Sequence, residues 1–275
     1  MLSRSEPALS PGTSWIGERG HHEPGAFCWA GLASSDPADA KSFYASMFGW
    51  KSEDMPAGDF GSYAALRHNS REVAILYRQT REARAAQAAP HWTAYVSVED
   101  ADASALLVRE LGGAVLRDPL DLADAGRVAA VRDPLGAIFS LWQPRAHAGA
   151  EVIDDIGALS WHELVTPNVE RAKSFYGALF AWEYQAGPGR LTTITNAGSR
   201  IGTMREDSEP ERASASSWIS YFGVVSARDA QQTAGRNRGR TMTGAADSPI
   251  GRTALLADRQ GATFAVLERA AAKAA

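Results

Sequence analysis

Hydrophobic residues recur with a helical period between positions 37 and 48. Asp36 precedes this stretch as an N-cap, and Pro37 is its first helical residue. The hydrophobic positions fall at i, i+3, i+4, i+7 and i+8, so they share one face; they are Ala40, Phe43, Tyr44, Met47 and Phe48. A second helix is predicted from about Asp100 to Leu111, where Gly112 and Gly113 stop it.

Short apolar or alternating runs surround these two helices and predict strands. The runs cover residues 27–33, the region near Trp50, 62–67, 72–77, 91–98, the region near Val115, 126–131 and 137–142. The order of one strand, one helix and three strands therefore occurs twice in the first half of the chain.

The second half of the chain repeats the first half. Five pairs of identical residues are separated by 132 positions: Trp29 and Trp161, Leu32 and Leu164, Tyr44 and Tyr176, Phe48 and Phe180, Trp50 and Trp182. Further pairs follow at a separation of 126 (Trp92 and Trp218, Tyr95 and Tyr221) and of 125 (Asp133 and Asp258, Gly136 and Gly261, Phe139 and Phe264). The shrinking separation indicates residues lost from loops of the second copy, where deletions are tolerated.

The repeat divides the 275 residues into two tandem domains of two modules each. We expect domains at 25–143 and 158–268, joined by a linker at 144–157 that is rich in Ala, Gly and charged residues. Residues 1–24 lack an apolar period and are predicted to form a disordered arm, and 269–275 a short tail.

Charge and composition narrow the location and the partners. The formal net charge of −4 argues against a nucleic-acid or anionic-membrane surface. A single cysteine, Cys28, permits no intramolecular disulfide and no zinc-type cysteine cluster. The chain has no apolar run long enough to span a bilayer, and its start lacks the apolar core of a signal peptide. We therefore expect a cytoplasmic protein without a nucleic-acid or membrane partner.

Three motifs resemble those of the vicinal oxygen chelate superfamily, which includes glyoxalase I, extradiol dioxygenases and bleomycin-resistance proteins. They are F-Y-x-x-x-F-x-W at 43–50 and 175–182, W-x-x-Y-x-x-V at 92–98 and 218–224, and D-P-x-G-x-x-F at 133–139, with a looser copy at 258–264. The resemblance covers residues 26–268. It implies an α+β fold of four βαβββ modules in two tandem glyoxalase-like domains, with open cup-shaped mixed sheets and helices outside.

The resemblance also locates the positions where metal-dependent members of the superfamily carry His or Glu. In this sequence those positions hold Trp29, Thr93 and Ser140 in the first copy, and Trp161, Ile219 and Ala265 in the second. Stretches 71–78 and 200–205 add an acid only at Glu72, at the start of its strand. Because no set supplies three ligands, we predict neither a metal nor another cofactor.

His162 and Glu163 are the two neighbouring side chains from which a rebuilt metal site would have to be formed. Side chains of a strand alternate between its faces, so one of these neighbours faces the cup and the other faces the helices. The register favours His162 on the helix side and Glu163 in the cup. His91 shares a face with Thr93 but lies at the mouth of its strand, as a rim residue.

The same alternation predicts the lining of both cups. The candidate ligand contacts are Trp29, Thr93, Tyr95, Ser140, Trp161, Glu163 and Tyr221. Aromatic walls with a few polar groups are typical of small-molecule sites. Glu163 is also the candidate catalytic residue, because burial among aromatic rings would raise its pKa and suit it to acid or base chemistry.

Several functions are compatible with this lining, and turnover is left open. The leading hypothesis is a glyoxalase/bleomycin-resistance-type protein that sequesters or carries a flat, partly apolar metabolite or antibiotic without a metal. The alternatives are a metal-free isomerase, lyase or cofactorless oxygenase using Glu163, a metal-dependent glyoxalase or dioxygenase rebuilt around His162 and Glu163, and a regulatory protein with decayed cups. Because four modules pair within one chain, we expect a monomer (an internal pseudo-dimer) or a weak homodimer.

Overall fold

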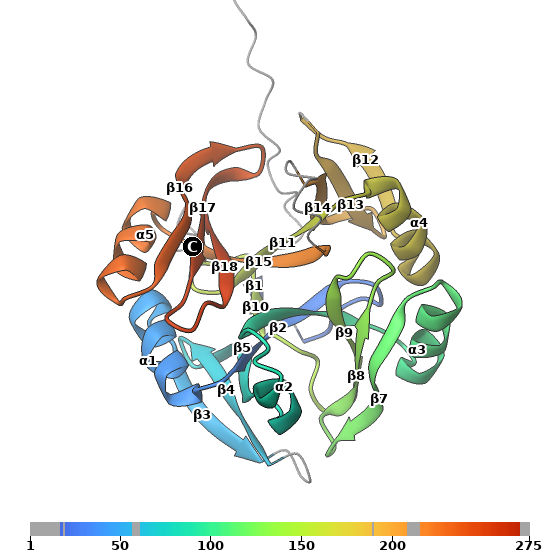
Figure 1. The fold of residues 1–275 in the computed structure, drawn as a ribbon, viewed down its shortest axis with the longest axis horizontal. Coiled ribbons are helices and arrows are strands. Elements are labelled where there is room, and N and C mark those ends of the chain that lie inside the picture. The colour runs from blue at the N-terminus through green and yellow to red at the C-terminus, as the bar shows by residue number, and fades with distance from the viewer. Residues whose placement is uncertain (1–16, 19, 57–60, 189, 208–214, 270–275) are drawn as a thin grey trace, which may run out of the picture.

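The computed structural model describes residues 17–18, 20–56, 61–188, 190–207 and 215–269. Their strands form two large mixed sheets, one from each copy of the repeat, and the longer helices lie around the outside (Figure 1). This arrangement confirms the predicted α+β class with four βαβββ modules. No helix of the described residues is both long enough and apolar enough to cross a membrane.

The first sheet contains two modules. Module 1 consists of β2 (Phe27–Ser34), α1 (Pro37–Phe48), β3 (Lys51–Pro56), β4 (Ser62–His68) and β5 (Arg71–Arg78). Module 2 consists of β6 (His91–Ser97), α3 (Ala101–Glu110), β7 (Ala114–Leu122), β8 (Gly126–Arg132) and β9 (Ile138–Pro144). The strand order is β3-β4-β5-β2-β6-β9-β8-β7, so the opening strands β2 and β6 meet antiparallel at its centre.

The second sheet repeats this plan. Module 3 consists of β11 (Leu159–Thr166), α4 (Val169–Phe180), β12 (Glu183–Ala186), β13 (Thr192–Asn196) and β14 (Ser199–Glu206). Module 4 consists of β15 (Ser217–Val224), α5 (Ala227–Arg236), β16 (Arg240–Ser248), β17 (Gly251–Ala257) and β18 (Thr263–Glu268). The strand order β12-β13-β14-β11-β15-β18-β17-β16 matches that of the first sheet position by position.

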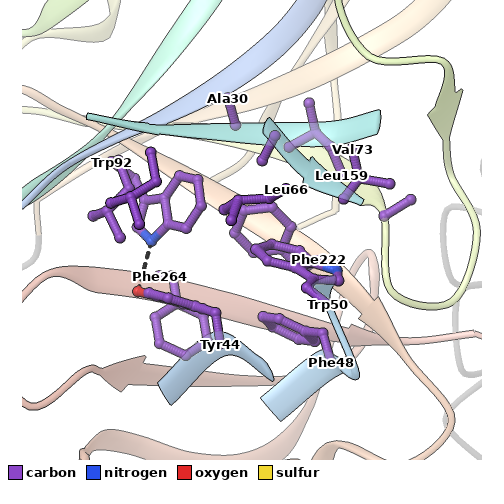
Figure 2. Close-up of a cluster of buried hydrophobic side chains, with 14 of the residues drawn as sticks. Ala30, Tyr44, Phe48, Trp50, Leu66, Val73, Trp92, Leu159, Phe222 and Phe264 are labelled. Atoms are coloured by element: carbon purple, nitrogen blue, oxygen red, sulfur yellow. Dashed lines mark hydrogen bonds between the residues drawn. The ribbon is translucent and has the colours of Figure 1, made fainter. Parts of the chain in front are cut away.

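Helices from different copies pack together at the seam between the sheets. Helix α1 contacts α5 on one side of the molecule, and α3 contacts α4 on the other (Figure 1). Figure 2 shows the core beside α1, where Tyr44, Phe48 and Trp50 of module 1 pack against Phe222 and Phe264 of module 4. The two copies therefore share their hydrophobic cores instead of each burying one alone.

A buried hydrogen-bond chain joins the copies on each side. The indole Nε1 of Trp92 donates to the Tyr44 hydroxyl at 2.8 Å, and that hydroxyl donates to Asp258 Oδ2 at 3.2 Å (Figure 2 draws the first of these bonds). Asp258 Oδ1 accepts the backbone N–H groups of Gln260 and Ala262, which fixes its turn. The tyrosine of the helix motif thus binds the aspartate of the other copy's turn.

The other side of the molecule repeats this chain with the copies exchanged. Trp218 Nε1 donates to the Tyr176 hydroxyl at 2.8 Å, and that hydroxyl donates to Asp133 Oδ2 at 3.0 Å. The three motifs of the sequence therefore meet in two equivalent places. Burial of all these groups makes each bond costly to leave unmade.

The arm and the linker are more closely packed than the sequence suggests. Residues 1–16 and 19 of the predicted arm lie outside the described residues, but β1 (Gly17–Glu18) pairs with β10 (Val152–Ile153) of the linker. His22 is buried and its Nε2 lies 2.9 Å from the carbonyl oxygen of Ala150. A short helix, α2 (Arg81–Ala85), also lies between β5 and β6, where no element was predicted.

Candidate functional site

The first cup is filled by its own side chains. A Cβ atom at Gly31 would lie 2.8 Å from Tyr95 and 3.2 Å from Tyr77, so both rings press against the central strand. The Tyr77 hydroxyl interacts with Thr93 and Tyr95, and Tyr95 interacts with Ser140. Burial raises the pKa of both tyrosines, which keeps these hydroxyls neutral. The polar groups of the predicted lining residues Thr93, Tyr95 and Ser140 are thus already paired with one another or with Tyr77.

Trp29 has no open ring face. His147 of the linker stacks on it with the ring centroids 4.6 Å apart, and Tyr95 and Trp142 pack edge-on at 5.8 and 5.4 Å. Only 2% of Trp29 is exposed. Trp29 and Trp161 occupy equivalent positions of the repeat, and the linker covers Trp29 through His147.

The second cup has a polar wall built by module 3. Trp161 Nε1 donates to Thr203 Oγ1 at 3.1 Å, which fixes the indole against β14. Glu163 lies two residues further along β11, on the same face, and Arg205 lies two residues beyond Thr203 on β14. Arg205 Nε donates to Glu163 Oε1 at 2.7 Å. The carboxylate is almost fully buried, while 38% of the arginine side chain is exposed.

Tyr221 extends this polar wall across the central strand pair, because it is the register partner of Trp161. Burial, followed by the nearby charge of Glu163, raises the pKa of Tyr221. The hydroxyl interacts with Glu163 and stays protonated, so it is a permanent hydrogen-bond donor. Glu163 is therefore held between a cation and a neutral donor.

Module 4 supplies an apolar wall on the other side of the cup. Its side chains pack around Trp161 and Tyr221 and are Ile219, Ile250, Leu255, Ala265 and Leu267. The second cup is consequently two-sided. Its polar groups come from β11, β14 and the Tyr221 hydroxyl on β15, and its aliphatic groups come from β15, the turn before β17, β17 and β18. Such a surface suits a ligand with one polar edge and one apolar face.

His162 faces the helix layer, as the strand alternation favours. Its ring packs on Phe27 with the centroids 4.1 Å apart and lies near Trp218. Burial lowers its pKa to about 3. His162 and Glu163 project from opposite faces of β11, so these two side chains cannot bind the same ion.

The metal-binding positions of the superfamily fit a divalent ion poorly in this chain. The inward side chains at those positions are Trp29, Thr93 and Ser140 in one cup, and Trp161, Ile219 and Ala265 in the other. Among the described residues, no three or more His, Cys, Asp or Glu side chains are grouped so that they could hold a metal. Among the residues that the structure describes, Glu163 is the carboxylate of the polar wall in the second cup, and Arg205 already neutralises it.

One further cavity, of about 330 Å³, lies outside both cups. It is formed where the segment before β2 meets β10 and the turn between β13 and β14, and its lining includes Glu23, Phe27, Ile153 and Asn196. Asn196 Nδ2 donates to the carbonyl oxygen of Pro24 at 2.9 Å, which ties that segment to the turn. We place the candidate site in the second cup, because there a charged pair faces an apolar wall.

The paired sheets and the two cups define a tandem protein of the glyoxalase type, and similar proteins agree. The sequence profile of the Glyoxalase/Bleomycin resistance protein/Dioxygenase superfamily matches residues 27–141. A protein of Mycobacterium tuberculosis named "Putative glyoxylase CFP32" is 33% identical over 259 residues, which cover 92% of this chain and 98% of that protein. The chain therefore belongs to the Glyoxalase/Bleomycin resistance protein/Dioxygenase superfamily.

Two other similarities extend over most of the chain. The anthracycline biosynthesis protein DnrV of Streptomyces peucetius is 31% identical over 261 residues, 89% of this chain and 94% of that protein. The crystal structure of the Mn(II)-bound glyoxalase from Novosphingobium aromaticivorans superposes with a TM-score of 0.60 at 13% identity, covering 88% of this chain and 81% of that one. At 13% identity, the similarity to the Novosphingobium glyoxalase shows a shared fold.

Sequence reasoning missed Arg205 and His147. Arg205 alternates with Thr203 along a strand, so period-two reading of residues 199–206 was a usable signal for its inward position. No sequence signal placed His147 on Trp29, because that contact depends on the path of the linker.

Proposed function

We propose that this protein binds a flat, partly apolar small molecule in its second cup, without a metal. The observation that carries the proposal is the two-sided wall of that cup. Trp161 and Tyr221 lie between the charged pair of module 3 and the aliphatic side chains of module 4. A flat ligand can place an apolar face against the aliphatic wall while its polar edge meets Arg205 and Tyr221.

The geometry of Glu163 supports binding over proton transfer. A general base needs a lone pair directed at the substrate. One oxygen of Glu163 accepts the Arg205 Nε bond, and the carboxylate also interacts with the Tyr221 hydroxyl. In our proposal, Glu163 orients these two donors and does not itself move a proton.

The relatives support a planar ligand. DnrV of Streptomyces peucetius is named for anthracycline biosynthesis and aligns along most of this chain. Anthracyclines are flat polycyclic aromatic molecules with a polar edge, and such rings gain affinity by stacking on tryptophan and tyrosine. The matching family is also named for bleomycin resistance.

Titration calorimetry with a planar neutral probe, anthraquinone-2-carboxamide, tests the proposal. We expect Trp161→Leu to weaken binding by about 30-fold or more, since removing a buried aromatic anchor typically costs about 2 kcal/mol. Trp29→Leu is the matched control from the first copy, and we expect it to leave the affinity unchanged, because His147 covers Trp29. Absence of binding to the wild type, or equal losses in the two variants, contradicts the proposed site.

A further inference from the structure

We propose that the ligand of the second cup carries an anionic oxygen, such as a carboxylate or an acidic enolate, which binds to the guanidinium of Arg205. This inference rests on the proposed function and names the ligand class of the same site.

Arg205 is only partly used by the protein. Its Nε donates to Glu163 Oε1. Among the described residues, the Arg205 side chain makes this one hydrogen bond. The two terminal amino groups of its guanidinium are therefore available to a ligand. The residue is the second-last of β14, and 38% of its side chain is exposed. Part of a planar donor group is thus accessible to solvent beside Glu163.

The available edge fits an anionic oxygen better than a neutral one. A guanidinium carries five N–H donors in a fixed fork that matches a carboxylate, and charge-assisted hydrogen bonds are about twice as strong as neutral ones. The hydrogen bond from Nε to Glu163 restricts the orientation of the guanidinium plane. The aliphatic wall of module 4 reduces competition from water for the bound charge.

The first cup serves as an internal control for the charged pair. Glu163 aligns with Gly31, and Arg205, the register partner of Val165, aligns with Tyr77, the register partner of Ala33. The same backbone positions are therefore neutral in the first cup. Since the fold forms there without the pair, we attribute the pair to ligand selection and not to the architecture.

A matched pair of probes tests the inference: anthraquinone-2-carboxylate and anthraquinone-2-carboxamide, which share a ring and differ in charge at neutral pH. We expect the wild type to bind the carboxylate about tenfold or more tightly than the amide. Arg205→Gln should reduce this ratio to one or below, because the unpaired Glu163 then repels the carboxylate, and it should weaken amide binding less than carboxylate binding. Glu163→Gln should increase the ratio, because it removes the negative charge that repels the bound carboxylate. Arg109→Gln, which removes an exposed arginine of α3, is the control for net charge and should leave the ratio unchanged.

The outcomes separate this inference from the proposed function. If both probes bind equally, or if Arg205→Gln leaves the ratio unchanged while Trp161→Leu still weakens binding, the anionic-ligand inference is wrong and the proposed function stands. If neither probe binds the wild type, both are wrong. A ratio that falls in Arg109→Gln as much as in Arg205→Gln also overturns the inference, because it indicates long-range attraction instead of a contact.

Discussion

Acidification should destabilise this protein through one buried histidine. His162 is 1% exposed, its ring packs on Phe27, and its Nε2 has no hydrogen-bond partner among the described residues. Ser220 Oγ lies 3.4 Å from Nδ1, which is a weak contact. Burial lowers the pKa of His162 from 6.5 to about 3, because an imidazolium there would lose its hydration.

The sign and size of the effect follow from proton binding. Below pH 6.5 the unfolded chain protonates this histidine, whereas the folded chain does not until the pH approaches 3. Stability is therefore complete above about pH 6.5 and falls as the pH drops, by roughly 1.4 kcal/mol per pH unit. Between pH 7 and pH 5 the loss from this one group is about 2 kcal/mol.

Urea unfolding of the wild type and of His162→Gln, at pH 7 and at pH 5, measures this loss. Each protein is compared with itself, so a constant destabilisation by the substitution cancels. The wild type should lose about 2 kcal/mol more than His162→Gln on acidification. His91→Gln, at the half-buried start of β6, is the control and should behave like the wild type. Equal acid losses in the wild type and in His162→Gln refute the reasoning.

Three further predictions concern the fold, the metal content and the assembly. Tyr176→Phe should cost about 1–3 kcal/mol in urea unfolding, because it leaves Trp218 Nε1 and Asp133 Oδ2 buried without their partner, and Tyr44→Phe should cost a similar amount; a loss within error of zero contradicts this. Elemental analysis of purified untagged protein should find no stoichiometric divalent metal, and near one ion per chain contradicts the prediction. Light scattering should give a monomer or a loose dimer, and a tight tetramer is the contrary result.

The repeat made most of the fold predictable. Matching residues at separations of 132, 126 and 125 positions indicated two copies, and hydrophobic periods divided each copy into two modules of strands and helices. The partners of the motif residues were not predictable, because Tyr176 and Asp133 come from different copies and meet only when the helices pack at the seam. The sequence marked these residues as a motif, and the structure shows that they join the copies.

Alternation along β11 placed Trp161 and Glu163 in the cup and His162 on its other face. It could not distinguish the two cups, since the difference arises from contacts between distant segments. His147 covers Trp29 because of the path of the linker, and Arg205 reaches Glu163 from a neighbouring strand 42 residues away. Periodicity gives the face of a side chain but not its partner on another strand.

A crystal structure of the protein with bound anthraquinone-2-carboxamide tests the central claim most directly. The account predicts one ring system in the second cup, in contact with Trp161, with an apolar face against Ile219 and Leu255 and its polar edge beside Arg205 and Tyr221. Density for the ring in the first cup, or in the cavity beside Asn196 with the second cup free of it, would contradict the account.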